Sequence, residues 1–143
     1  MAFTGNWATD TFKIGLLDGV FDFNSAQTYK IALYTNAATL NQYTTAYTST
    51  GEISGGNYVA GGLTLTVSQV PTVGNSGSTA YISFNNAAWT GAITARGALI
   101  YLDNGTTNPA VCVLDFGSDK ISTTTFTVQF PAVTNTSAII RLS

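Results

Sequence analysis

Residues 97–102, GALIYL, most constrain what this chain can fold into, because nearly every side chain in this predicted β-strand is apolar. Successive side chains of a strand point to opposite faces of a sheet, so a strand with one solvated face alternates apolar and polar residues. Here Leu99 and Tyr101 point to one face and Ile100 to the other. The same alternation predicts that Arg96 lies on the Ile100 side. Both faces of this strand therefore need a cover.

Strand patterns recur along the chain with turn residues between them. Besides residues 94–102, the segments with this pattern are 29–35, 63–70, 79–84, 110–116, 126–130 and 137–142. Regularly spaced short strands with intervening turns are typical of a sandwich or barrel. We therefore predict an all-β fold, an antiparallel β-sandwich of about seven strands with a short N-terminal helix.

The N-terminal part of the chain has a different pattern. Thr9 or Asp10 is a candidate N-cap and Gly19 a stop signal, which predicts a short helix between them. The apolar residues of this helix, Phe12 and Leu16 among them, cover more than one narrow stripe, so it should pack against something. At 143 residues we expect one domain, with residues 1–27 as helix and arm and residues 28–143 as the sandwich.

Three segments could cover the outer face of the central strands. The stretch NGTTNP at 104–109 is short enough to join residues 97–102 and AVCVL at 110–114 as a hairpin in mid-sheet. The inner faces of this hairpin would fill the core. The outer faces need a cover, and the candidates are the N-terminal helix, the long connection at 36–61 or another subunit. An apolar patch of this size that stayed uncovered would be an association site by default.

The composition restricts the classes of partner. Only 8% of the residues are charged, against about 25% in a typical soluble domain. The cationic residues do not form the cluster that a phosphate backbone requires, so we expect no nucleic-acid partner. These residues are Lys13, Lys30, Arg96, Lys120 and Arg141. A net charge of −2 gives little repulsion between copies, which favours association.

The chain has no secretory or membrane pattern. Its first residues, MAFTGNWATD, contain neither the basic nor the apolar region of a secretory signal, and no apolar run approaches the roughly 20 residues that span a bilayer. We expect a protein made in the cytoplasm, with no membrane partner. Cys112 is the only cysteine and has apolar neighbours, so we interpret it as a buried core residue.

The sequence offers little for catalysis. It contains no histidine, which removes the usual proton shuttle, the commonest metal ligand and the histidine-based nucleophile arrangements. A pair of carboxylates could still act as in a glycosidase, and the candidates are Asp103, Asp115, Asp119 and Glu52. A calcium site at Asp115 and Asp119 is a further alternative. These acids lie at predicted turns, where solvated acids are common, so we expect no enzyme, no metal and no cofactor.

Several residues are candidates for contacts with partners. Trp89 and the tyrosines Tyr43, Tyr47 and Tyr58 could form a sugar-binding platform, or they could be core and interface anchors. Arg96 begins an apolar strand and is either a solvated strand end or a contact between subunits. The second interpretation predicts that Arg96→Ala weakens assembly with little loss of monomer stability.

The order of segments resembles a group of small proteins encoded among the structural genes of tailed bacteriophages. The resemblance covers roughly residues 28–142 and is most specific in the blocks ITARGALIY and VLDFGSDK. YKIALYTNAATL, GEISGGNYVAGGLTL and FTVQFP also contribute to it. The resemblance implies a virion component that decorates or cements a capsid shell or forms part of the tail or neck.

We therefore expect a non-enzymatic virion protein, assembled in the host cytoplasm, that stabilises a capsid shell through repeated contacts. Its partners would be the major capsid protein or other virion proteins, and further copies of itself in a homo-oligomer. The candidate interface residues are Arg96, Trp89, Tyr43, Tyr47, Tyr58, Phe12 and Leu16. A tail or neck component and a host-surface carbohydrate-binding module are the alternatives.

Overall fold

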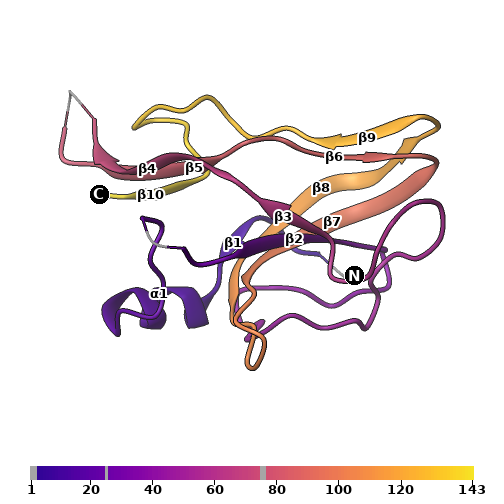
Figure 1. Ribbon diagram of the computed structural model, residues 1–143, viewed down its shortest axis with the longest axis horizontal. Helices are drawn as coiled ribbons and strands as arrows, with labels where there is room; N and C mark the ends of the chain where they lie inside the picture. The colour runs from indigo at the N-terminus through magenta and orange to yellow at the C-terminus, as the bar shows by residue number, and fades with distance from the viewer. Residues whose placement is uncertain (1–2, 25, 75–76) are drawn as a thin grey trace.

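In the computed structural model, which describes residues 3–24, 26–74 and 77–143, β-sheets pack in two layers (Figure 1). The larger sheet has five strands in the order β1-β8-β7-β2-β3. These strands are Trp7–Ala8, Ala110–Ser122, Ile93–Leu102, Tyr29–Tyr34 and Leu63–Leu65. All of its strand pairs are antiparallel.

The second layer contains two smaller sheets. A three-stranded sheet has the order β10-β5-β4 and is formed by Ile140–Leu142, Ala80–Phe84 and Val67–Val73. A two-stranded sheet pairs β6, Ala87–Thr90, with β9, Thr125–Val128. The fold is therefore an all-β sandwich with one short helix among the described residues, which confirms the predicted class.

The N-terminal helix α1 spans Asp10–Leu17 and begins where the sequence predicts. The Thr9 side chain accepts a hydrogen bond from the Phe12 backbone N–H at 3.1 Å, so Thr9 is the N-cap. Thr9 also donates its hydroxyl to the Ala110 carbonyl at 2.9 Å, which ties the helix start to β8. Phe12 is buried against Phe21 at a ring-centroid distance of 5.0 Å, so the helix covers one end of the core.

Some strand boundaries differ from the sequence prediction. β6 was not predicted, and it forms because Ala87 and Trp89 alternate into the core while Ala88 and Thr90 face solvent. β8 continues to Ser122, beyond the end that the sequence indicates. Residues 116–119 have no partner on β7, and pairing resumes from Lys120 to Ser122 opposite Ala95 to Ile93. Trp7–Ala8 also joins the larger sheet, so the predicted N-terminal arm contributes a strand.

The space between the two layers holds the main hydrophobic core. β2 and β7 contribute Ile31, Leu33 and Ile100, all fully buried, to this core. From the opposite layer, Phe126 and Val128 of β9 face them, as the alternation in FTVQF predicts. Cys112 also lies in this core, as predicted, and burial raises the pKa of its thiol to about 12.

The outer face of the five-stranded sheet is covered by the chain itself. Leu99 and Tyr101 of β7 pack there in a second hydrophobic cluster. The cover consists of Ala38 and Leu40 from the long connection at 36–61 and of Phe3, each at most 1% exposed. Figure 1 shows this connection running along the side of the sheet opposite β5 and β6. Of the three candidate covers, the long connection is therefore the principal one.

Arg96 lies on the opposite face from the one that simple alternation predicts. The pairing of β7 with β8 shifts register between Ala95 and Gly97, and such a β-bulge changes which face the following residues point to. Ala95 and Ala98 consequently both point into the main core. Arg96 points to the outer face, where its guanidinium lies 5.6 Å from the centre of the Phe3 ring. The prediction that Arg96 shares a face with Ile100 is wrong for this reason.

We predict that Phe3→Ala lowers the free energy of unfolding by about 3–5 kcal/mol, because it leaves a cavity over Leu99 and uncovers the sheet. Urea unfolding measures the change. Tyr43→Ala, at a side chain that is 70% exposed, is the matched control and should change stability by less than about 0.5 kcal/mol. Equal effects of the two substitutions would contradict the proposed cover.

Candidate interaction surface

Glu52 fixes the long connection to the outer face of the sheet. Its carboxylate accepts hydrogen bonds from the Tyr47 hydroxyl at 2.7 Å, the Tyr58 hydroxyl at 2.6 Å and the Gly61 backbone N–H at 2.7 Å. The Tyr58 hydroxyl in turn accepts from the Leu33 N–H at 2.9 Å. Charge-assisted bonds of this kind are stronger than bonds between neutral groups. The cluster therefore joins the middle and the C-terminal end of the connection to β2.

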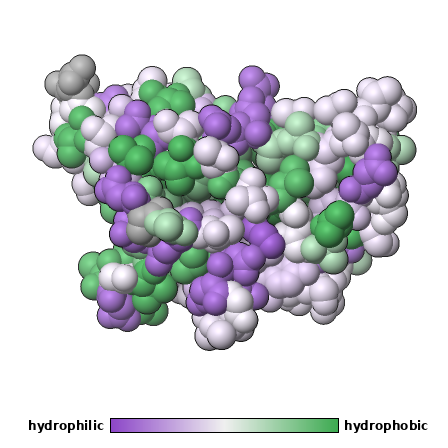
Figure 2. All heavy atoms as spheres, in the orientation of Figure 1, coloured by the Kyte–Doolittle hydropathy of each residue, from purple (hydrophilic) through white to green (hydrophobic). Residues whose placement is uncertain are grey.

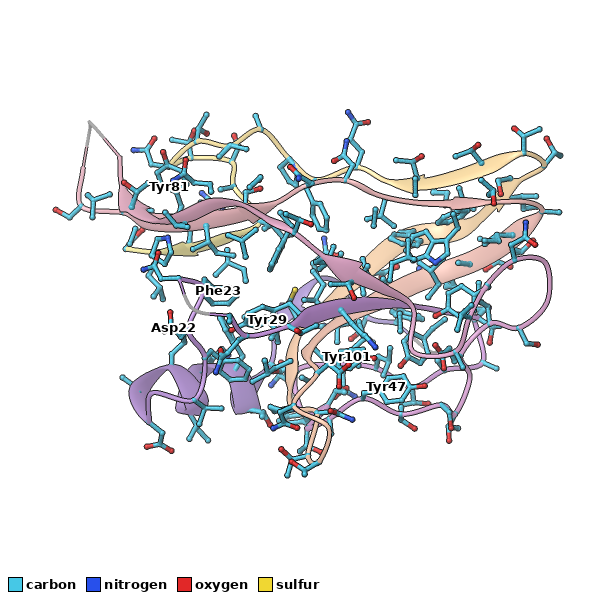
Figure 3. All side chains as sticks on the ribbon, in the orientation of Figure 1. Asp22, Phe23, Tyr29, Tyr47, Tyr81 and Tyr101 are labelled. Carbon is cyan, nitrogen blue, oxygen red and sulfur yellow. The ribbon has the colours of Figure 1, made fainter. Side chains whose placement is uncertain are left out.

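Two of the candidate tyrosines belong to this cluster. Tyr58 is buried, with 9% of its surface exposed, and Tyr47 is half-buried, stacked on Tyr101 at a ring-centroid distance of 4.8 Å (Figure 3). Burial and the Glu52 carboxylate raise the pKa of Tyr47 to about 12, and the same causes raise the pKa of Tyr58 further. Both side chains therefore support the fold. Tyr58 is too buried to offer an open contact surface, which corrects its assignment, whereas Tyr47 is half-buried and remains a candidate contact.

Trp89 also lies in the core. It is 4% exposed, and it packs near Tyr58 and Phe126 at ring-centroid distances of 6.2 and 6.3 Å. A sugar stacks on an aromatic face only when that face is open to solvent. Of the four aromatic side chains in the predicted platform, only Tyr43 is exposed to solvent, so the structure does not bring a platform together.

Arg96 is engaged within its own chain. Its guanidinium forms an ion pair with Asp115 of β8, and the two side chains are only 12% and 13% exposed. The Asp115 backbone N–H donates to the Asn6 side-chain oxygen at 2.7 Å. Together with the Phe3 ring under Arg96, these contacts hold the N-terminal segment against the sheet. Arg96 is therefore neither a free strand end nor an available contact residue.

The other candidate acids come from the turn after β7, the long connection and β8. Asp103 forms an ion pair with Lys30 at 2.8 Å, and this hydrogen bond lowers the pKa of Asp103. Glu52 and Asp115 are engaged as described, and Asp119 is exposed on β8. Among the described residues no group of three His, Cys, Asp or Glu side chains is placed to hold a metal ion.

Exposed apolar side chains gather at the end of the molecule formed by α1 and the three-stranded sheet. Most of the large hydrophobic side chains that are exposed among the described residues lie on α1, the turn after it, β4 and β10. They are Ile14, Leu17, Val20, Val70, Val73 and Leu142, and Leu17 is 91% exposed. Figure 2 shows hydrophobic side chains most numerous on this half of the visible face, while the other half is mostly neutral in hydropathy.

A groove lies beside α1 and β10. It has a volume of about 760 Å³ and lies between α1, the edge of the larger sheet and the C-terminal segment. Phe12 and Leu16 line it, and they also line a second hollow of about 200 Å³ beside Phe23 and Tyr81. Phe12 is 2% exposed and serves as floor, which corrects its assignment as a contact residue. Leu16 is partly exposed and remains a candidate contact.

Sequence reasoning identified only the part of this surface that lies on the predicted helix, through Phe12 and Leu16. Its residues come from α1, β4, β5 and β10, which are separated in the chain and meet only in the folded molecule. The available signal was the spread of apolar residues in this helix, Leu17 among them, beyond one narrow stripe. Most of the predicted contact residues instead followed aromatic content, which marks core positions as often as surfaces.

Comparison with known proteins gives no relative: neither a family model, nor a curated protein, nor a solved structure matches the chain. In the described part of the chain no helix is long and apolar enough to cross a membrane.

We predict that the stability of the protein falls as pH rises above about 10. The unfolded chain then loses its tyrosine protons, while in the folded state the raised pKa of Tyr47, about 12, keeps that proton bound. Removal of this titrating group in Tyr47→Phe should make the fall with pH less steep. Urea unfolding across this pH range measures both curves. Identical slopes would show that Tyr47 is not held as described.

We predict that Arg96→Ala lowers the free energy of unfolding by roughly 3 kcal/mol, because Asp115 would be left as an unpaired and mostly buried charge. Chemical unfolding measures this change. Lys120→Ala, at an exposed cation on the same hairpin, is the control and should stay within about 0.5 kcal/mol of the natural protein. If the two variants were equally stable, the role of the ion pair would be refuted.

Proposed function

We propose that this chain is a non-enzymatic structural protein of a tailed-bacteriophage virion, one that decorates or cements the capsid shell. The sequence resemblance in ITARGALIY and VLDFGSDK supports the virion assignment. In the structure these blocks form β7 and β8, the central hairpin of the larger sheet, together with the Arg96–Asp115 ion pair. The blocks therefore specify the scaffold, and the contacts with partners come from other residues.

The observation that carries the proposal is the gathering of exposed apolar side chains at one end of a nearly uncharged molecule. Soluble monomers rarely expose large contiguous apolar patches, and such patches commonly mark contact sites. With 8% charged residues, the remaining surface offers little repulsion to neighbours. If each contact with the shell buries about 1,600 Å² and the contacts are repeated by capsid symmetry, the protein stays attached to the shell without any single strong binding site.

This account moves the interface away from the back of the sheet. The apolar outer face of β7 is covered by Phe3, Ala38 and Leu40, so it needs no second subunit. The end formed by α1 and the three-stranded sheet takes that role. Contact with the major capsid protein or with further copies of this chain would then occur beside Leu16 and Leu17.

A tail or neck component is the second candidate, supported by the same sequence resemblance and the same surface. The two locations differ in copy number, because a shell carries hundreds of equivalent positions and a ring only a few. Quantitative mass spectrometry of purified particles that contain this chain distinguishes them. Hundreds of copies per particle support decoration, a handful supports a tail or neck position, and absence from the particle would refute both.

We predict that Leu17→Lys abolishes attachment to the particle while the protein stays folded. Leu17 is 91% exposed at the last turn of α1, where a lysine is compatible with the helix and places a charge in the apolar surface. Val59→Lys, at a position that is 71% exposed on the long connection, is the matched control and should attach normally. Co-sedimentation with particles lacking this chain measures attachment, and circular dichroism confirms the fold.

A further inference from the structure

The groove beside α1 lies on the open side of the sandwich, between two sheet edges. β1 is the last strand of the five-stranded sheet, and β10 is the last strand of the three-stranded sheet. Residues of both strands line the groove, with Trp7 and Ala8 on one wall and Ile140 and Leu142 on the other. Edge strands present backbone N–H and C=O groups that can pair with a further strand.

The two edges of the smaller sheet differ in how well they are protected. β4 contains Pro71, and its pairing with β5 shifts register twice between Val67 and Thr72. Proline and bulges both hinder the addition of another strand. β10 contains neither feature, and its register with β5 is regular from Ile140 to Leu142. The accessible edge of this sheet is therefore the one that faces the groove.

The side chains that line the groove are apolar at its floor and positive at its rim. Phe12, Leu16 and Val113 contribute to the floor, and the charged side chains of the lining are Lys13 and Arg141. Lys13 is already paired with Asp10 at 3.2 Å. Arg141 donates one N–H to the Thr136 carbonyl at 2.6 Å and takes part in none of the ion pairs among the described residues. Its remaining guanidinium donors match a carboxylate.

A second copy of this chain fits the edge poorly. Two β10 strands paired across a twofold axis would bring Arg141 close to its symmetry mate, and like charges opposed across strands are destabilising. A strand with an acidic residue at that position removes this repulsion and adds a charge-assisted hydrogen bond.

We propose that the groove binds an extended segment of a partner protein, which adds as a strand beside β10, places alternate apolar side chains on the floor and sets a carboxylate against Arg141. This inference deepens the proposed function and rests on it for the origin of the partner. In this mode of recognition backbone pairing supplies affinity, and the side-chain pockets and the charge supply specificity. Because β10 spans only Ile140–Leu142, the added strand is short.

The test uses two synthetic hexapeptides, acetyl-Thr-Val-Glu-Val-Thr-Val-amide and the same peptide with lysine in place of glutamate. Titration into the isotope-labelled full chain is followed by backbone amide shifts. We expect the glutamate peptide to shift amides of β1, α1 and β10 and to bind at least tenfold more tightly than the lysine peptide. Arg141→Glu should reverse this preference. Lys120→Glu, the same charge change on β8 at a residue that does not line the groove, should leave it unchanged.

Shifts confined to other surfaces, equal affinities of the two peptides, or no binding of either would overturn the groove proposal. The proposed function fails separately. If the Arg141→Glu variant attaches to particles as well as the natural protein, the groove is not the attachment site although the virion role stands. If the peptide result holds and the chain is absent from particles, the groove stands and the virion role falls.

Discussion

The central hairpin of this protein is apolar on both faces, and the rest of the structure follows from the need to cover it. Leu99 and Ile100 are adjacent in sequence, point in opposite directions and are both fully buried. One face is covered by the second layer of strands, which is the usual arrangement of a sandwich. The other face requires a third element, and the long connection at 36–61 supplies it together with Phe3.

A connection without regular strands covers a sheet only when its own polar groups are satisfied. Glu52 meets this need by accepting from two tyrosine hydroxyls and one backbone N–H, and the Ile53 N–H donates to the Leu33 carbonyl at 3.0 Å. The carboxylate and the tyrosines are thus structural. Because these contacts cover the back of the sheet within one chain, the exposed apolar surface beside α1 is left as the feature that favours association.

The sequence predicted the elements whose signals are local. The cap at Thr9, the face alternation of β9 and the hairpin through residues 104–109 follow from neighbouring residues. The face on which Arg96 lies could not be predicted from neighbouring residues, because the bulge after Ala95 depends on pairing with β8. The partners of Glu52 and the meeting of α1 with β10 depend on contacts between distant segments. Aromatic content alone could not separate Trp89, in the core, from Tyr43, on the surface.

Native-state hydrogen exchange tests most directly whether the long connection is part of the core. The Thr35 and Tyr47 N–H groups donate to Gly51 and Asn108 carbonyls at 2.9 Å, and both bonds close the cover over the sheet. The account predicts that these amides exchange only on global unfolding, at the rate of the amides in β2 and β7. Exchange of the connection many times faster than that of the central strands, in the isolated protein, would show that the sheet is not covered by its own chain.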